Sequence, residues 1–74
     1  MRLTVKLFAT FRVNRFSSAE QDYPEGTPVG AIIDAIGIDR QEVGITMLNS
    51  RHCRMDTVPQ QGDVLAIFPV IGGG

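Results

Sequence analysis

The sequence of 74 residues is poor in several features that mark other classes of protein. It holds one cysteine, Cys53, which excludes an intrachain disulfide framework and fits a reducing compartment. It also holds one histidine, His52, so the four ligands of a structural zinc site are lacking. The seven Lys and Arg residues are scattered and the formal net charge is −1, which argues against a nucleic-acid-binding face. We therefore expect no bound metal and no nucleic-acid partner, but partners that are proteins.

Long apolar runs are missing as well. Residues 1–12 contain no apolar core long enough for export, and no stretch is long enough to span a bilayer. We therefore expect a cytoplasmic protein without a membrane partner. The content of 43% hydrophobic and 20% charged residues is that of an ordinary globular fold. A single domain of this size buries only about 60% of the surface of its unfolded chain, which leaves no room for an elaborate active-site cleft.

Apolar patterning predicts four strands and a short additional one. Residues 2–8 alternate, with Leu3, Val5 and Leu7 on one side, as in a half-buried strand. The remaining segments follow in chain order: a wide hairpin turn over 11–16, a polar edge strand over 17–23, a strand over 43–48, a turn at 49–51, a short strand over 52–54 and a last strand over 64–68. The nearly continuous apolar run of this last strand predicts a central place in the sheet.

One helix is predicted after residue 27. Thr27 is placed to cap it, and Pro28 suits its first position. A single apolar stripe at helical spacing follows, and Gly37 is the expected C-terminal stop; the stripe consists of Val29, Ile32, Ile33 and Ile36.

The order of these elements predicts an α+β fold in which a mixed sheet packs on the helix. If the first and last strands are parallel neighbours, the connection between them can cross over through the helix in the right-handed sense. The predicted core then consists of Leu3, Val5, Leu7, Leu65 and Ile67 against Ile32, Ile33 and Ile36. Phe8, Ala66 and Phe68 are left on the opposite face, which is either a protein-binding surface or covered by loops.

The chain ends on Gly72, Gly73 and Gly74, which follow the apolar strand over 64–68 and a bridge of Pro69, Val70 and Ile71. We expect one folded domain over residues 1–68 and a flexible tail over 69–74. Glycine has no Cβ and adopts many backbone conformations, so such a tail can thread a narrow tunnel and present its carboxylate to an enzyme. The alternative is an inert, frayed end.

Three stretches together resemble a known family: Lys6 to Arg12, the turn at Gly62-Asp63-Val64, and the ending Ile67 to Gly74. The chain resembles the ubiquitin-like sulfur carriers, which include the small subunit of molybdopterin synthase and the thiazole-pathway carrier. Residues 6–12 favour the molybdopterin branch. The resemblance implies the β-grasp (ubiquitin-like) fold, a mixed four- to five-stranded sheet packed on one helix. A third glycine and Val70, at a position that is often proline, depart from the usual pattern.

The resemblance also implies a function. The Gly74 carboxylate would be adenylated by an E1-like enzyme that consumes ATP and then converted to a thiocarboxylate. Gly72 and Gly73 would thread into the partner's site, and the docking surface would consist of Phe8, Phe68, Val70 and Ile71. The carrier itself would hold no catalytic residue and no bound cofactor, and its sulfur would pass to the larger molybdopterin synthase subunit or to another acceptor.

Other functions remain open from the sequence. The chain is alternatively a thiazole-pathway carrier, a protein modifier conjugated through Gly74, or a non-covalent interaction module. His52 and Cys53 are neighbours that a strand would point to opposite faces, so we do not expect them to form a catalytic pair.

Overall fold

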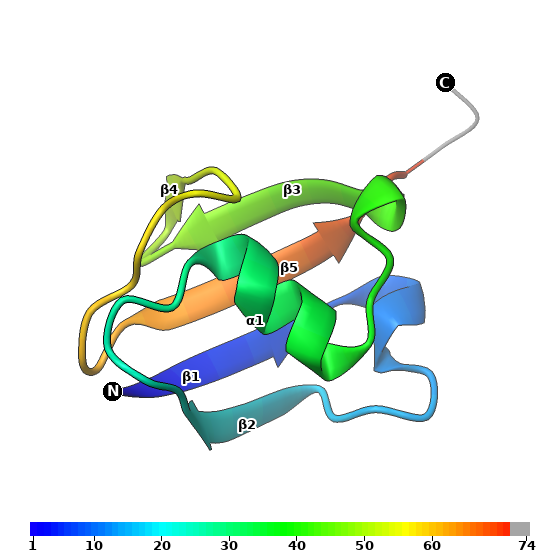
Figure 1. Cartoon of the computed structure of the whole chain (residues 1–74). Helices are drawn as coiled ribbons and strands as arrows, with labels where there is room; N and C mark the ends of the chain where they lie inside the picture. The colour runs from blue at the N-terminus through cyan, green and yellow to red at the C-terminus, as the bar shows by residue number, and fades with distance from the viewer. Residues whose placement is uncertain (72–74) are drawn as a thin grey trace.

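The structure is a computed structural model that describes residues 1–71. In this part of the chain the elements are β1 (Arg2–Leu7), the 3-10 helix η1 (Ala9–Arg12), β2 (Ser18–Asp22), α1 (Val29–Ile36), the 3-10 helix η2 (Arg40–Glu42), β3 (Val43–Leu48), β4 (Arg51–His52) and β5 (Val64–Pro69). The strands form one sheet in the order β2-β1-β5-β3-β4. Figure 1 shows α1 crossing one face of this sheet.

The predicted topology is confirmed. β1 and β5 are parallel neighbours, whereas β2 pairs with β1, and β3 with β5, in antiparallel fashion. β5 is therefore the central strand, as its continuous apolar run predicted, and β2 is an edge strand. Because β1 and β5 run in the same direction, both end on the same side of the sheet (Figure 1). Phe8, which follows β1, therefore lies against Phe68, close to the start of the C-terminal tail.

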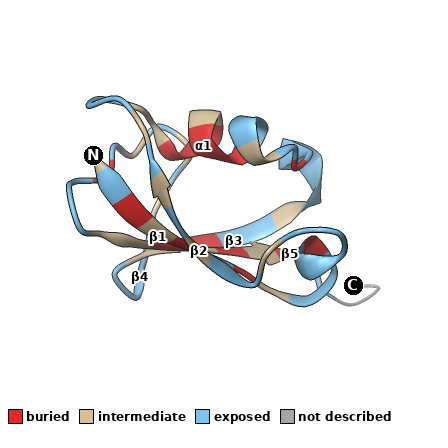
Figure 2. Cartoon of the chain, turned by 90° about the horizontal axis from the view of Figure 1, so that it is seen from below, coloured by how far each residue is buried: buried red, intermediate tan, exposed pale blue. Residues whose placement is uncertain are grey.

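The core lies between the sheet and α1, as the burial colours in Figure 2 show. Every second residue of β1 and of β5 is buried against the helix, which is the alternation that the sequence predicted. The buried apolar residues are Leu3, Val5, Leu7, Phe11, Val29, Ile32, Ile33, Ile38, Leu65 and Ile67. Ile36 was predicted in this core but is only partly buried at its margin.

The start of α1 differs from the prediction. Thr27 does not cap the helix, because its hydroxyl donates a hydrogen bond to the Pro24 carbonyl oxygen at 2.7 Å. The first amides of α1 instead bond to the segment before β5: Val29 N donates to Thr57 O and Gly30 N donates to Met55 O, each at 2.9 Å. The helix start is thus satisfied by backbone distant in sequence, and this contact attaches α1 to the loop that leads into β5.

Two turns are also more regular than expected. The region predicted as a wide turn over 11–16 begins inside η1, which contacts β5 and buries Phe11. In the β3–β4 hairpin, Asn49 and Ser50 both have positive φ values, 51° and 68°, as a tight two-residue turn requires. β4 therefore starts at Arg51, one residue earlier than predicted.

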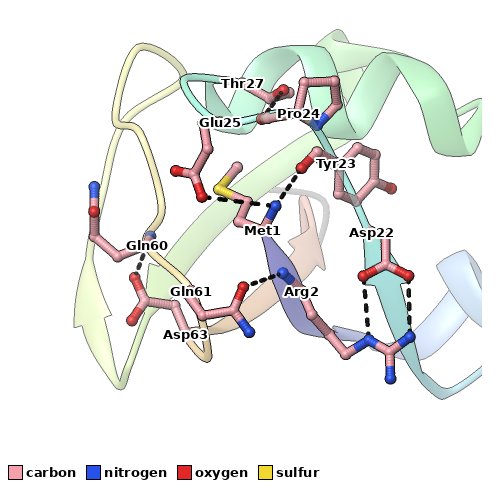
Figure 3. A network of polar contacts seen from close by, with 10 residues as sticks. All are labelled: Met1, Arg2, Asp22, Tyr23, Pro24, Glu25, Thr27, Gln60, Gln61 and Asp63. Atoms are coloured by element: carbon pink, nitrogen blue, oxygen red, sulfur yellow. Dashed lines mark hydrogen bonds and ion pairs between the residues drawn. The ribbon is translucent and has the colours of Figure 1, made fainter.

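A polar network closes the sheet edge opposite the tail (Figure 3). The Met1 amino group donates to Tyr23 O at 2.6 Å, and Arg2 binds Asp22 through two hydrogen bonds of 3.1 Å. The Arg2 amide also donates to the Gln61 side chain at 2.7 Å. The hydrogen bond from Arg2 holds the pKa of the Asp22 carboxyl below its usual value. These contacts join β1, β2 and the loop before β5 where β1 begins. The C-terminal tail leaves the sheet at the opposite end of the strands, where β1 and β5 end.

Candidate functional site

The base of the C-terminal tail is part of the sheet. β5 extends through Pro69, one residue beyond the domain boundary expected from the sequence, and Pro69 is buried. The next amide is also bound, since Val70 N donates to Glu42 O at 2.9 Å. Beyond it Ile71 is 76% exposed. Within the described residues, the Val70–Glu42 hydrogen bond is the last backbone contact along the chain before the glycines.

A bulge in β3 makes room for this tail base. Val43 pairs with Pro69 and Ile45 pairs with Phe68, so Gly44 is an extra residue in β3. The backbone of the tail base crosses close to Gly44: a Cβ placed there would lie 2.7 Å from Pro69 O and 2.9 Å from Val70 Cα. A glycine is therefore what permits this approach.

An apolar surface lies on the sheet face that α1 leaves uncovered. The rings of Phe8 and Phe68 stack with centroids 4.2 Å apart and an interplanar angle of 13°. The β3–β5 register places Ile45 beside Phe68 and Met47 beside Ala66 on the same face. We call these five residues, Phe8, Ile45, Met47, Ala66 and Phe68, the open-face patch. Phe8, Ala66 and Phe68 are each partly buried, and Ile45 beside them is 42% exposed.

The patch is hollowed next to the phenylalanine stack. A pocket of about 500 Å³ lies there. It is lined by Lys6, Phe8, Met47, Asn49, Ser50, Val64, Ala66 and Phe68. The pocket thus joins the stack to the β3–β4 turn, and its size suits one or two side chains of a partner.

Two basic residues flank the patch. Lys6 is exposed beside it, and the guanidinium carbon of Arg12 lies 5.3 Å from the centroid of the Phe8 ring, within cation–π range. Arg12 is held there because its Nε donates to Leu7 O at 2.8 Å. Arg15 instead points away from the patch residues, because its Nη2 donates to Gly37 O at 2.9 Å. An acidic partner surface would complement Lys6 and Arg12.

The residues predicted for docking lie at one edge of the sheet. Phe8 and Phe68 are in contact, while Val70 and Ile71 follow as exposed side chains at the start of the tail. The sequence reasoning missed the contributions of β3, Ile45 and Met47. The alternation of residues 43–48 carried this signal, because it places Ile45 and Met47 on one side and the buried Thr46 on the other. Gly72, Gly73 and Gly74 lie outside the described residues.

His52 and Cys53, the neighbouring pair considered for chemistry, differ in their burial. Cys53 is partly buried against the core, whereas His52 is exposed. Among residues 1–71 no group of three His, Cys, Asp or Glu side chains is placed to hold a metal ion. In the same part of the chain, no helix has the length and apolarity that crossing a membrane would take.

A family model described as the ThiS family matches residues 5–74. The chain belongs to the ThiS family. This match includes the tail base, the open-face patch and all three terminal glycines. No curated protein gives a significant match.

Solved structures show the same fold. SAMP1 from Haloferax volcanii superposes with a TM-score of 0.78 at 21% identity, covering 100% of each chain. A candidate molybdopterin converting factor subunit 1 from Pyrococcus furiosus gives 0.76 at 27% identity, covering 96% of this chain and 99% of that one. Subunit 1 in a complex of subunits 1 and 2 of molybdopterin-converting factor from Helicobacter pylori gives 0.67 at 19% identity, covering 100% of each chain. The predicted β-grasp fold and the predicted family resemblance are thereby confirmed.

Proposed function

We propose that the protein is a sulfur carrier whose C-terminal carboxylate, at Gly74, is activated and then converted to a thiocarboxylate. The observation that carries the proposal is the family match, which runs through residue 74 and so includes the terminal glycines. The placement of the tail base supports it, since the tail starts beside an apolar patch, flanked by Lys6 and Arg12, on which a partner enzyme can dock. In this proposal the chain is a substrate of other enzymes, not a catalyst.

The proposed chemistry needs only the terminal carboxylate. One carboxylate oxygen attacks the α-phosphorus of ATP, the bond from that phosphorus to the bridging oxygen breaks, and pyrophosphate leaves. The resulting acyl-adenylate has a good leaving group, in contrast to the free carboxylate. A hydrosulfide ion then adds to the carbonyl carbon, the bond to the AMP oxygen breaks, and AMP leaves with one proton released from sulfur. No net oxidation or reduction occurs.

Apart from its terminal carboxylate, the tail would provide reach and no reactive side chain. The last backbone contact described is at Val70, so the four residues 71–74 span at most about 14 Å when fully extended. This is shorter than the distance of about 20 Å available if all six residues from Pro69 were free. The activating enzyme must therefore bring its ATP site close to the edge of the sheet. Docking on the open-face patch, with Val70 and Ile71 beside it, would place the enzyme there.

For the pathway, we propose molybdopterin biosynthesis, in which the cofactor carries molybdenum or tungsten. The support is the similarity to the Pyrococcus furiosus candidate subunit 1, at 27% identity over nearly all of both chains. A complex of subunit 1 with subunit 2 is known for the Helicobacter pylori protein of the same fold. We extend that arrangement to this chain and propose a larger synthase subunit as the sulfur acceptor.

The test is incubation of the chain with its E1-like enzyme, ATP and sulfide, followed by intact-mass spectrometry. We expect the mass to rise by the difference between one sulfur and one oxygen atom. A variant truncated after Gly72 serves as the control, because it keeps every described residue but loses the terminal carboxylate at Gly74. Labelling of the truncated variant at the level of the full chain, or no labelling of the full chain, would refute the proposal.

The same measurement separates the carrier from a protein modifier. A modifier joined through Gly74 to a lysine would appear as a covalent conjugate whose mass is the sum of both chains less one water. SAMP1, a small archaeal modifier protein, shares the fold, but at 21% identity this likeness extends to the fold alone. We therefore place the sulfur carrier first.

A further inference from the structure

Gly44 lies in an unusual position for a strand residue. It is exposed, so burial does not restrict its side chain, yet the three heavy atoms nearest to an added Cβ are all backbone atoms of the tail base. They are Pro69 O at 2.7 Å, Val70 Cα at 2.9 Å and the Pro69 carbonyl carbon at 3.0 Å. Ordinary van der Waals contact begins at 3.4 Å, so the closest separation is 0.7 Å too short. A backbone neighbour cannot rotate away as the end of a side chain can.

A side chain at position 44 would disturb the tail base, Pro69 and Val70, and leave the rest of the sheet in place. On one side of Gly44, Ile45 pairs with Phe68, and the regular pairing of β3 with the central strand β5 continues from there to Leu48. On the other side, the tail base is held by the pairing of Val43 with Pro69 and by the hydrogen bond from Val70 to Glu42. A side chain at position 44 would therefore displace Pro69 and Val70 while the core pairing between β1 and β5 stays in place.

We propose that Gly44 is a positioning residue that sets where, and in which direction, the C-terminal tail leaves the sheet. This inference rests on the proposed function, because it assumes that an enzyme must receive the terminal carboxylate in one geometry. The four residues after Val70 begin from this fixed point, so a displaced start moves the carboxylate away from the ATP site. Misplacement of a reacting group by about 1 Å can cost about 100-fold in rate.

The first experiment compares amide hydrogen exchange by NMR in the wild-type chain and in Gly44→Ala. We expect the Val70 amide to lose its protection in Gly44→Ala, whereas the Leu65 and Ile67 amides of the central strand keep theirs. Gly30→Ala is the matched control, since a Cβ at Gly30 would also come within 2.7 Å of another atom, but that atom ends the Arg40 side chain. Unchanged protection of Val70 in Gly44→Ala would overturn the inference.

The second experiment measures ATP–pyrophosphate exchange catalysed by the activating enzyme with each variant as substrate. For Gly44→Ala we expect kcat to fall by about tenfold or more and KM to change by a smaller factor, because the open-face patch is kept while only Val70 of the docking residues is displaced. Inserting one glycine before Gly72 in the Gly44→Ala chain should restore part of the lost kcat, which a folding defect would not allow. A normal kcat for Gly44→Ala would refute the positioning role. If the wild-type chain itself supports no pyrophosphate exchange, the sulfur-carrier proposal is refuted. The hydrogen-exchange experiment is independent of that result, because it tests only whether Gly44 fixes the position of the tail base.

Discussion

The stack of Phe8 on Phe68 gives the sharpest test of the open-face patch. Replacement of Phe68 by alanine removes a ring that stacks at 4.2 Å on its neighbour but is only partly buried. Full truncation of a buried phenylalanine costs about 3–5 kcal/mol. A partly buried ring should cost less, and we expect a loss of about 1–2 kcal/mol in the free energy of unfolding, of which about 0.5–1.5 kcal/mol is the aromatic pairing.

The effect on docking should exceed the effect on stability. Central aromatic residues of an interface commonly contribute about 2 kcal/mol or more, which corresponds to a loss of about 30-fold in affinity. We therefore expect Phe68→Ala to remain folded and to raise KM for pyrophosphate exchange by about 30-fold. Chemical denaturation followed by circular dichroism would measure the free energy of unfolding, and the kinetics of pyrophosphate exchange would measure KM. Val58→Ala is the control, since Val58 is 40% exposed on the loop before β5, at the opposite end of that strand from the tail.

A double-mutant cycle with Phe8→Ala isolates the pair. If the rings act as one unit, the second substitution should cost less than it does alone, with a coupling of about 1 kcal/mol in stability. An unchanged KM for Phe68→Ala would refute the assignment of the patch as the docking surface. Zero coupling between Phe8 and Phe68 would show instead that the stack contributes nothing beyond the separate rings.

Two further predictions concern the fold. Ile33→Ala should lower the free energy of unfolding by about 2–5 kcal/mol, because Ile33 is fully buried between α1 and the sheet. Thermal unfolding would measure this loss, and a loss below about 1 kcal/mol would contradict the assigned core. Burial raises the pKa of Tyr23 above its ordinary 10.0, so its contribution to stability should be complete below pH 10.0 and should be lost as the pH rises through the folded-state pKa. Since Tyr23 is the single tyrosine and tryptophan is absent, tyrosinate absorbance in a pH titration would report it directly, and identical midpoints in native and urea-unfolded protein would refute the shift.

The patterns that are local in sequence predicted most of the fold. Alternation in residues 2–8 and 64–68 was enough to assign the buried and open faces of β1 and β5, because a strand points successive side chains to opposite sides. The helical stripe from Val29 to Ile36 was found in the same way. The resemblance at both ends of the chain then predicted the family to which the chain belongs.

What the sequence did not reveal depends on contacts between distant segments. The cap of α1 was assigned to Thr27, yet the amides at its start bond to carbonyl groups of Met55 and Thr57. Phe11 has no periodic pattern around it and enters the core only because η1 contacts β5. Gly44 looked like any strand glycine, since its closeness to Pro69 exists only after β3 and β5 have paired.

The position of Lys6 has a practical consequence for the search for partners. Lys6 is the single lysine of the sequence, and it lines the pocket on the open-face patch. Apart from reacting at the Met1 amino group, reagents that acylate amines, including common fluorophores, biotin esters and coupling resins, would therefore attach on the proposed docking surface. If that proposal holds, bait prepared in that way would block its own docking surface, so attachment through a different chemical group, such as a thiol placed on the loop before β5, should capture partners that amine-coupled bait misses.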